Sequence, residues 1–141
     1  MKHIKQPTKT SCGQTCLAMI AGITPEEVFK LLPDTSEGAR PKQLRAIAPL
    51  LGFLLGRPGK TPLVIKPRGV FIARVIIPIQ GVRSRRGWTM TSHFIVYDCN
   101  PRAPIIHDPS QNQRENAISY LSRLEQEHSR LISLMRVWYM L

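Results

Sequence analysis

The spacing of apolar residues changes about halfway along the chain. In the first half they recur at helical intervals, and N-cap residue types and closing glycine or proline residues mark the helix ends. These signals predict three helices, over residues 13–21, 25–32 and 41–51. Gly22 and Gly52 close the first and the third, since glycine commonly follows a helix C-terminus. The second opens at Thr24, an N-cap residue type followed by proline and two acidic residues.

In the second half the apolar residues form short runs that are rich in β-branched side chains. Proline, glycine or asparagine bounds these runs, which is typical of strands. The predicted strands cover residues 63–65, 70–77, 93–97 and 104–107. Helices followed by strands indicate the α+β class, with the N-terminal helices packed on an antiparallel sheet.

The last part of the chain, residues 113–141, returns to helical spacing. Ile118, Leu121 and Leu124 fall on one apolar stripe that continues to Met135, which predicts one long C-terminal helix. The expected organisation is therefore a domain of residues 1–111 and a C-terminal helix within 112–141. This helix packs on the same domain or serves in association, and dimerisation through it is the alternative use of its apolar end.

Composition and local sequence add four constraints. The chain has 141 residues, 43% of them hydrophobic, which is enough for one packed core. Its longest apolar run, residues 70–79, contains Arg74 and Pro78 and is shorter than the ~20 residues that span a bilayer. The basic N-terminus lacks the apolar segment of a signal peptide. Three cysteines are too few for a disulfide scaffold, so we expect a reducing compartment and a cytoplasmic protein.

Four polar residues supply the parts of a cysteine-dependent acyl-transfer site: Gln6, Cys12, His93 and Asp108. A thiol is only slightly ionised at neutral pH, so it needs an imidazole to take its proton. Cys12 stands at the predicted start of the first helix, where the helix dipole lowers a thiol pKa. His93 is the candidate base, and Asp108 would accept a hydrogen bond from His93 Nδ1–H. The Gln6 amide and the Cys12 backbone N–H would form an oxyanion hole.

The surroundings of these residues carry a resemblance. It rests on Gln-X5-Cys-Gly-X2-Cys from Gln6 to Cys16, on spaced apolar residues from Pro41 to Phe53, on the run from Ser92 to Val96, and on Asp108-Pro109. About residues 4 to 111 resemble the bacteriocin-processing leader peptidases, although that family commonly has an acidic residue where this chain has Ser11. The resemblance implies a papain-like fold and cleavage after a double-glycine leader. It assigns Cys12 as nucleophile, His93 as base, Asp108 as orienting acid and Gln6 as oxyanion residue.

The expected function is therefore a cysteine peptidase that hydrolyses a peptide or isopeptide bond through a thioester. Two alternatives remain: a catalytically silent papain-like module that binds an anionic protein, and a cysteine-dependent acyltransferase or deamidase. No metal or organic cofactor is implied, because the spacing of Cys12 and Cys16 without a second compact ligand pair is weak for zinc. Cys16, one turn after Cys12, is interpreted as a buried structural thiol.

The formal charge of +11 is not explained by peptidase chemistry. A basic loop, residues 81–92, precedes the candidate base and contains the candidate substrate-binding residues Arg83, Arg85, Arg86 and Trp88. The loop could steer an acidic peptide or protein substrate, bind nucleic acid, or be merely solvated. Nucleic acid is disfavoured, because arginine and glycine with a single aromatic residue match no known nucleic-acid module.

Overall fold

The computed structural model of the chain describes residues 1–59, 68–84, 87–99 and 103–140, without the side chains of residues 79–84 and 87–90. Its elements are α1 (Cys12–Ala21), α2 (Pro25–Phe29), α3 (Pro41–Ile47), the 3₁₀ helix η1 (Ala48–Leu51), β1 (Phe53–Leu55), β2 (Gly69–Ser84), β3 (Gly87–Cys99), β4 (Ile105–His107), β5 (Glu115–Asn116), α4 (Ala117–Gln126) and β6 (Arg130–Tyr139). The α+β class expected from the sequence is confirmed.

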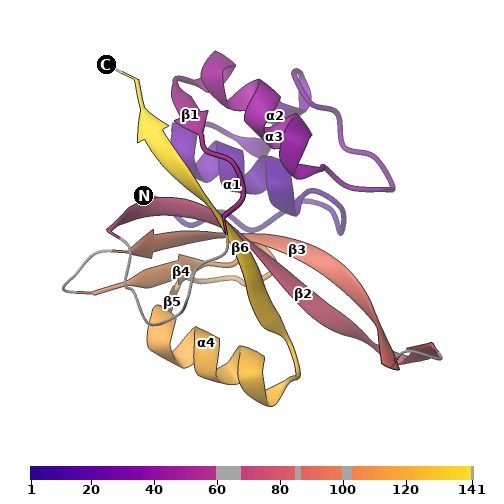
Figure 1. Ribbon diagram of the computed structural model, residues 1–141. Helices are drawn as coiled ribbons and strands as arrows, with labels where there is room; N and C mark the ends of the chain where they lie inside the picture. Colours follow the sequence, from indigo (N-terminus) through magenta and orange to yellow (C-terminus); the bar gives the residue numbers. More distant parts are fainter. Residues whose placement is uncertain (60–67, 85–86, 100–102, 141) are drawn as a thin grey trace.

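The strands form one antiparallel sheet in the order β1-β6-β2-β3-β4-β5. Helices α1, α2 and α3 lie on one side of this sheet, and α4 lies on the other (Figure 1). Alternate residues of β2 serve the two sides: Ile72 joins the cluster that contains α1, and its neighbours Phe71 and Ala73 join the cluster that contains Tyr120 of α4. Strands β2, β3 and β6 are therefore covered on both faces.

The predicted N-terminal helices are present with small changes at their ends. Helix α1 closes at Gly22, whose φ of 74° is the left-handed conformation that glycine adopts readily. The Thr24 side chain caps α2 by accepting a hydrogen bond from the Glu27 N–H. The helix predicted over 41–51 divides into α3 and η1. Pro49 has no N–H to bond the carbonyl four residues earlier, which favours the change of helix type there.

Of the predicted strands, 70–77 lies within β2 and 93–97 within β3, and 104–107 corresponds to β4. The predicted strand over 63–65 falls outside the residues that the structure describes. The short strands β1 and β5 were not predicted. Both are three residues or fewer, too short for period-2 alternation to be recognised.

The prediction of one long C-terminal helix is wrong. Helix α4 has 10 residues and ends before His128, which takes a left-handed φ of 60°. The chain then forms β6, which pairs with β1 on one side and β2 on the other. The middle of β6 faces both clusters, with Leu134 on the α4 side and Met135 and Val137 on the α1 side, so its sequence is a mostly apolar run, interrupted by Ser133 and Arg136, without the alternation of a half-exposed strand. Such a run does not distinguish a strand from a buried helix.

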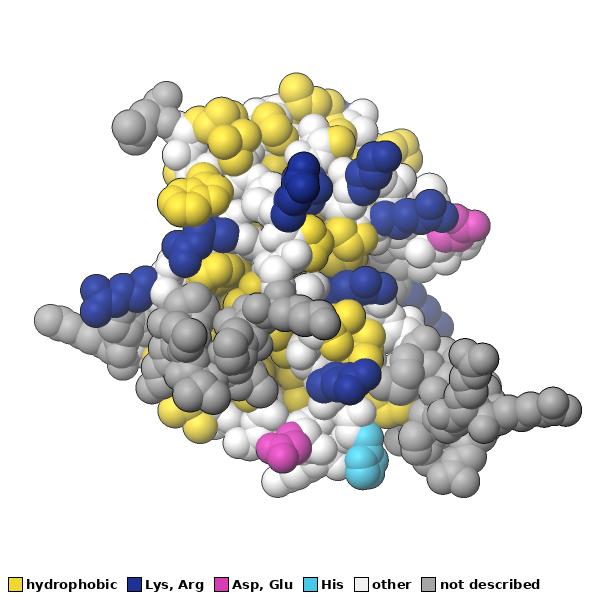
Figure 2. All heavy atoms as spheres, in the orientation of Figure 1, with side chains coloured by type: hydrophobic (Ala, Val, Ile, Leu, Met, Phe, Trp, Pro, Cys, Tyr) yellow, Lys and Arg dark blue, Asp and Glu magenta, His cyan; other side chains and the backbone are white. Residues whose placement is uncertain are grey.

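None of the helices in the described part of the chain combines the length and apolar character needed to cross a membrane. Lys and Arg side chains are spread over the face of the molecule shown in Figure 2, where acidic side chains are few. This distribution agrees with the formal charge of +11.

Candidate active site

Cys12 is the first residue of α1, as expected from the sequence. Ser11 occupies the N-cap position, but its side chain does not cap the helix. Its buried hydroxyl instead donates to the Thr8 carbonyl at 3.2 Å, and the Thr8 N–H donates back to it. The Ser11 carbonyl accepts from the Thr15 N–H and hydroxyl. These bonds anchor the loop that presents the thiol, and no acidic side chain is needed at position 11 to do so.

The thiol of Cys12 lies at the edge of the sheet, beside β3. It is partly buried, and its ionisation is governed by interaction with His93 and with the backbone N–H groups of Phe94 and Gly13. Burial raises the pKa of Cys12, but the bond and positive charge of His93 and these N–H groups lower it, leaving the pKa below its ordinary value. The start of α1 can approach β3 because of the register of the sheet. Strand β4 pairs with β3 only from Val96 to Asp98, so the edge of β3 near Phe94 is not covered by β4.

His93 connects the thiol to Asp108. Its Nε2 lies 2.6 Å from Asp108 Oδ1, and both side chains are buried. The expected bond through Nδ1 is therefore wrong. Since Nε2 is occupied, Nδ1 is the ring nitrogen available to Cys12. Burial lowers the pKa of His93, but its bonds to Asp108 and Cys12 raise it to about 9. The imidazole is thus charged near neutral pH, opposite a thiol with a lowered pKa.

Asp108 follows β4 and accepts hydrogen bonds on both carboxylate oxygens. Oδ1 receives the Ser110 N–H at 2.9 Å and the Ser110 hydroxyl at 2.7 Å, in addition to His93. Oδ2 receives the Tyr120 hydroxyl at 2.8 Å. Burial raises the pKa of Asp108, but His93 and Ser110 lower it to about 2 overall. The carboxylate therefore stays ionised opposite the imidazolium.

Sequence reasoning missed Ser110 and Tyr120. Ser110 had a recognisable signal, because an aspartate side chain commonly bonds the backbone N–H two residues later in a turn. Tyr120 lies outside the apolar stripe predicted for the tail: α4 buries Ala117, Tyr120 and Leu124, whereas Ile118 of that stripe is 66% exposed. A buried tyrosine hydroxyl usually finds a polar partner, but the sequence does not say which one.

Gln6 is hydrogen-bonded to the turn after Asp108 and to the loop before Cys12. Among the described residues it has no hydrogen bond to Cys12 itself. Its backbone N–H donates to the Pro109 carbonyl at 2.7 Å, and its side-chain Nε2 donates to the Thr8 carbonyl at 2.8 Å. Its Oε1 is buried without a hydrogen-bond partner in the described part of the chain. The second N–H of the amide remains available, and the oxyanion role of Gln6 stays a prediction.

The N-terminal segment is tied to the turn that carries Asp108. His3 Nε2 lies 2.8 Å from the Gln111 carbonyl oxygen, and His3 Nδ1 lies 3.2 Å from His107 Nδ1. The two rings stack with their centroids 5.4 Å apart. Burial and the positive charges of His3, the N-terminus and Arg114 lower the pKa of His107 to about 4. His107 is therefore a neutral structural residue behind the site at pH 7.

The three cysteines are free thiols in different environments. Cys16 is completely buried in the core around α1, and burial raises its pKa well above the ordinary value. This confirms the interpretation of Cys16 as a buried thiol. Among the described residues, no three His, Cys, Asp or Glu side chains gather so that they could hold a metal ion.

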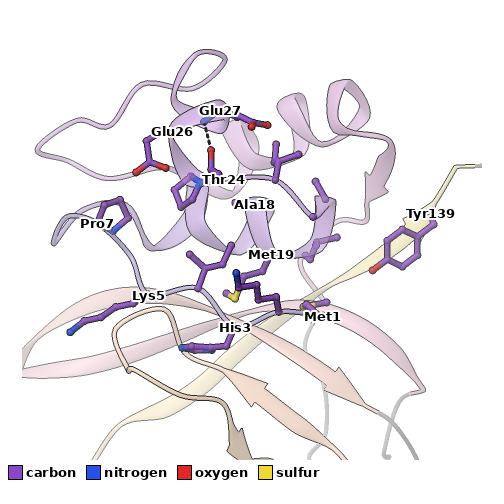
Figure 3. Close-up of a pocket in the computed structure, with 17 residues that line it drawn as sticks. Met1, His3, Lys5, Pro7, Ala18, Met19, Thr24, Glu26, Glu27 and Tyr139 are labelled. Atoms are coloured by element: carbon purple, nitrogen blue, oxygen red, sulfur yellow. Dashed lines mark hydrogen bonds between the residues drawn. The ribbon is translucent and has the colours of Figure 1, made fainter.

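The candidate substrate-binding residues are not tested by this structure. Arg85 and Arg86 lie outside the described residues, and so do the side chains of Arg83 and Trp88. A separate cavity of about 890 Å³ lies along the second half of α1 (Figure 3). The N-terminal segment with Lys5, the start of α2 with Glu26, and Tyr139 of β6 border it. None of the four catalytic candidates, Gln6, Cys12, His93 and Asp108, is among its lining residues.

Comparison with known proteins finds no matching family model and no matching curated sequence. The functional interpretation therefore depends on the residues of the site and their geometry.

Proposed function

We propose that the chain is a papain-like cysteine peptidase, which hydrolyses a peptide or isopeptide bond through a thioester on Cys12. One observation carries the proposal: His93, whose Nε2 lies 2.6 Å from Asp108 Oδ1, lowers the pKa of the Cys12 thiol, while Asp108 and Cys12 raise the pKa of the imidazole to about 9. An ion pair of thiolate and imidazolium is the reactive state of such enzymes.

In the proposed reaction, the Cys12 thiolate attacks the carbonyl carbon and forms a tetrahedral intermediate. His93 then gives its proton to the departing amine, and the carbon–nitrogen bond breaks to leave a thioester. A water molecule, deprotonated by His93, attacks the thioester and releases the acid and the thiolate. Asp108 holds the imidazole throughout and transfers no proton itself.

The developing oxyanion needs donors that do not move during the reaction. The first backbone N–H groups of α1 have no partner within the helix, and the Cys12 N–H is the one beside the sulfur. We assign the second donor to the Gln6 amide, because its backbone is tied to the turn of Asp108 and its side chain to the loop before α1.

The substrate is a peptide or protein, and we expect acidic segments to be favoured because of the charge of +11. Free thiols at all three cysteines suit a reducing compartment such as the cytoplasm. Cleavage after a double glycine is implied only by the resemblance to leader peptidases.

The test is labelling with an electrophilic peptide probe such as a peptidyl vinyl sulfone. At about pH 6, well below the ordinary thiol pKa, we expect a single adduct on Cys12. The Cys12→Ala variant should give none. The matched Cys16→Ala variant should be labelled like the wild type, since Cys16 is buried and its pKa is raised.

His93→Ala should slow the labelling, because the thiol then loses its ion-pair partner. Equal labelling of Cys12, Cys16 and Cys99, or a rate that does not depend on His93, would contradict an activated nucleophile. It would instead favour a module that only binds its partner. Products of a labelled peptide, analysed by mass spectrometry, then separate hydrolysis from acyl transfer.

A further inference from the structure

A tyrosine on the far side of the sheet reaches the active-site carboxylate. Tyr120 lies on α4, is 2% exposed, and its hydroxyl donates to Asp108 Oδ2 at 2.8 Å. Resting on the proposed function, we propose that Tyr120 is a positioning residue of the active site, which acts by holding the Asp108 carboxylate and touches no substrate. Tyr120 lies beyond residues 4–111, the part of the chain that resembles leader peptidases. The segment after residue 111 would thus complete the site.

The two carboxylate oxygens depend on different partners. Oδ1 accepts from His93 and from two groups of Ser110, whereas Tyr120 is the hydrogen-bond donor to Oδ2 among the described residues. The terminal torsion of an aspartate side chain is broad, so one well-bonded oxygen does not fix the carboxylate plane. A hydrogen-bond donor to the second oxygen fixes this plane. Without it, a buried and charged oxygen would lack a partner, which is costly.

Tyr120 is suited to this task chemically. Burial and the neighbouring charge of Asp108 raise the pKa of Tyr120 far above its ordinary value. The phenol therefore stays protonated over the working pH range. It can donate to the carboxylate but cannot compete with it as a second negative charge beside His93.

The ring is itself held in place. The Arg123 guanidinium lies over it, 5.2 Å from its centroid, and forms an ion pair with Glu115 at the start of the same segment. Asn116 caps α4 by accepting the N–H groups of Ile118 and Ser119. The direction of the Tyr120 hydroxyl is thus set by α4 and its first turn, independently of Asp108.

The test compares Cys12 alkylation by iodoacetamide in the wild type and in Tyr120→Phe, which keeps the ring and removes the donor. At about pH 6 we expect the rate to fall about 10-fold, the effect of losing one hydrogen bond to a charged group. At about pH 10, where the thiol is ionised without help, the rate should not change. Tyr139→Phe, which removes a half-exposed hydroxyl, is the matched control.

A structural defect gives a different result. Partial unfolding would expose Cys16 and Cys99 to the reagent, whereas loss of positioning leaves both unreactive. In the Asp108→Ala background, Tyr120→Phe should have no further effect at either pH, because the hydroxyl acts through that carboxylate.

The inference is overturned if Tyr120→Phe reacts at the wild-type rate at pH 6, reacts faster, or adds its full effect to Asp108→Ala. A faster rate would mean that the phenol weakens the carboxylate instead of orienting it. These outcomes leave the proposed function standing, provided that His93→Ala still slows Cys12 alkylation. If wild-type Cys12 shows no preferential reactivity, the proposed function and this inference both fail.

Discussion

At the scale of single residues, Gln6 is the site residue whose role can be separated most sharply from that of the thiol. In Gln6→Ala we expect kcat for a peptide substrate to fall roughly 10²- to 10³-fold, the usual effect of losing one oxyanion donor. Alkylation of Cys12 by iodoacetamide should stay at the wild-type rate, because that reaction forms no oxyanion. Both rates are measured on the same preparation.

The control for Gln6→Ala is Gln111→Ala, which removes an exposed amide from the turn after Asp108. It should leave both rates unchanged. Equal losses of turnover and alkylation in Gln6→Ala would assign Gln6 to the support of the Cys12 loop, through its bonds to Thr8 and Pro109, and would remove it from the oxyanion hole.

At the scale of elements, β6 is the strand on which the packing of both faces depends. Met135 is 1% exposed and belongs to the cluster on the α1 side, whereas Met140, just beyond the strand, is 46% exposed. Met135→Ala should lower the free energy of unfolding by roughly 2–5 kcal/mol, since it leaves a cavity. Met140→Ala should change it by less than about 0.5 kcal/mol.

Urea unfolding of the two methionine variants measures this difference. The dependence of the unfolding free energy on urea should be the same in both, since the same surface is exposed on unfolding. Similar stabilities would argue against β6 as an interior strand and would restore a peripheral C-terminal segment.

At the scale of the whole molecule, two histidines make stability depend on pH in opposite directions. His107 acts on the acid side of the stability profile (the acid limb), and His93 acts on the alkaline side (the alkaline limb). His93 has a folded pKa of about 9, above its unfolded value. Its contribution is complete below about pH 6.5 and is lost as the pH rises through about 9. His107 has a folded pKa of about 4, below its unfolded value. Its contribution is present above about pH 6.5 and is lost as the pH falls toward 4.

We therefore expect the highest melting temperature near pH 6.5, with an acid limb of roughly 3 kcal/mol. The alkaline limb should be smaller, because the lowered pKa of Cys12 adds stability as the pH rises and offsets part of the loss at His93. Circular dichroism between pH 4 and pH 10 measures the profile. His107→Phe should flatten the acid limb and keep the alkaline one, and His93→Phe should do the reverse. Asp108, with a pKa of about 2, contributes to acid sensitivity only below that range. An acid limb that persists in His107→Phe would assign it to other groups.

The sequence by itself determined the features that depend on a few neighbouring residues. Thr24 and the glycines at 22 and 52 mark helix ends through local hydrogen bonds and backbone freedom, and the structure agrees with them. The strands of residues 70–77 and 93–97 follow from β-branched runs. The chemical types at Cys12, His93 and Asp108 indicated their association before any distance was known, because each supplies a part that the others need.

Tertiary structure decided what depends on distant parts of the chain. Which nitrogen of His93 faces Asp108 depends on how β3 and the turn after β4 come together, and in the structure it is Nε2. The donor to the second carboxylate oxygen comes from α4, whose tyrosine looks in sequence like any apolar position of an amphipathic helix. The segment 130–139 is a strand because β1 and β2 pair with its two edges. An apolar run covered on both faces has no period of its own, so only its neighbours determine whether it extends or coils.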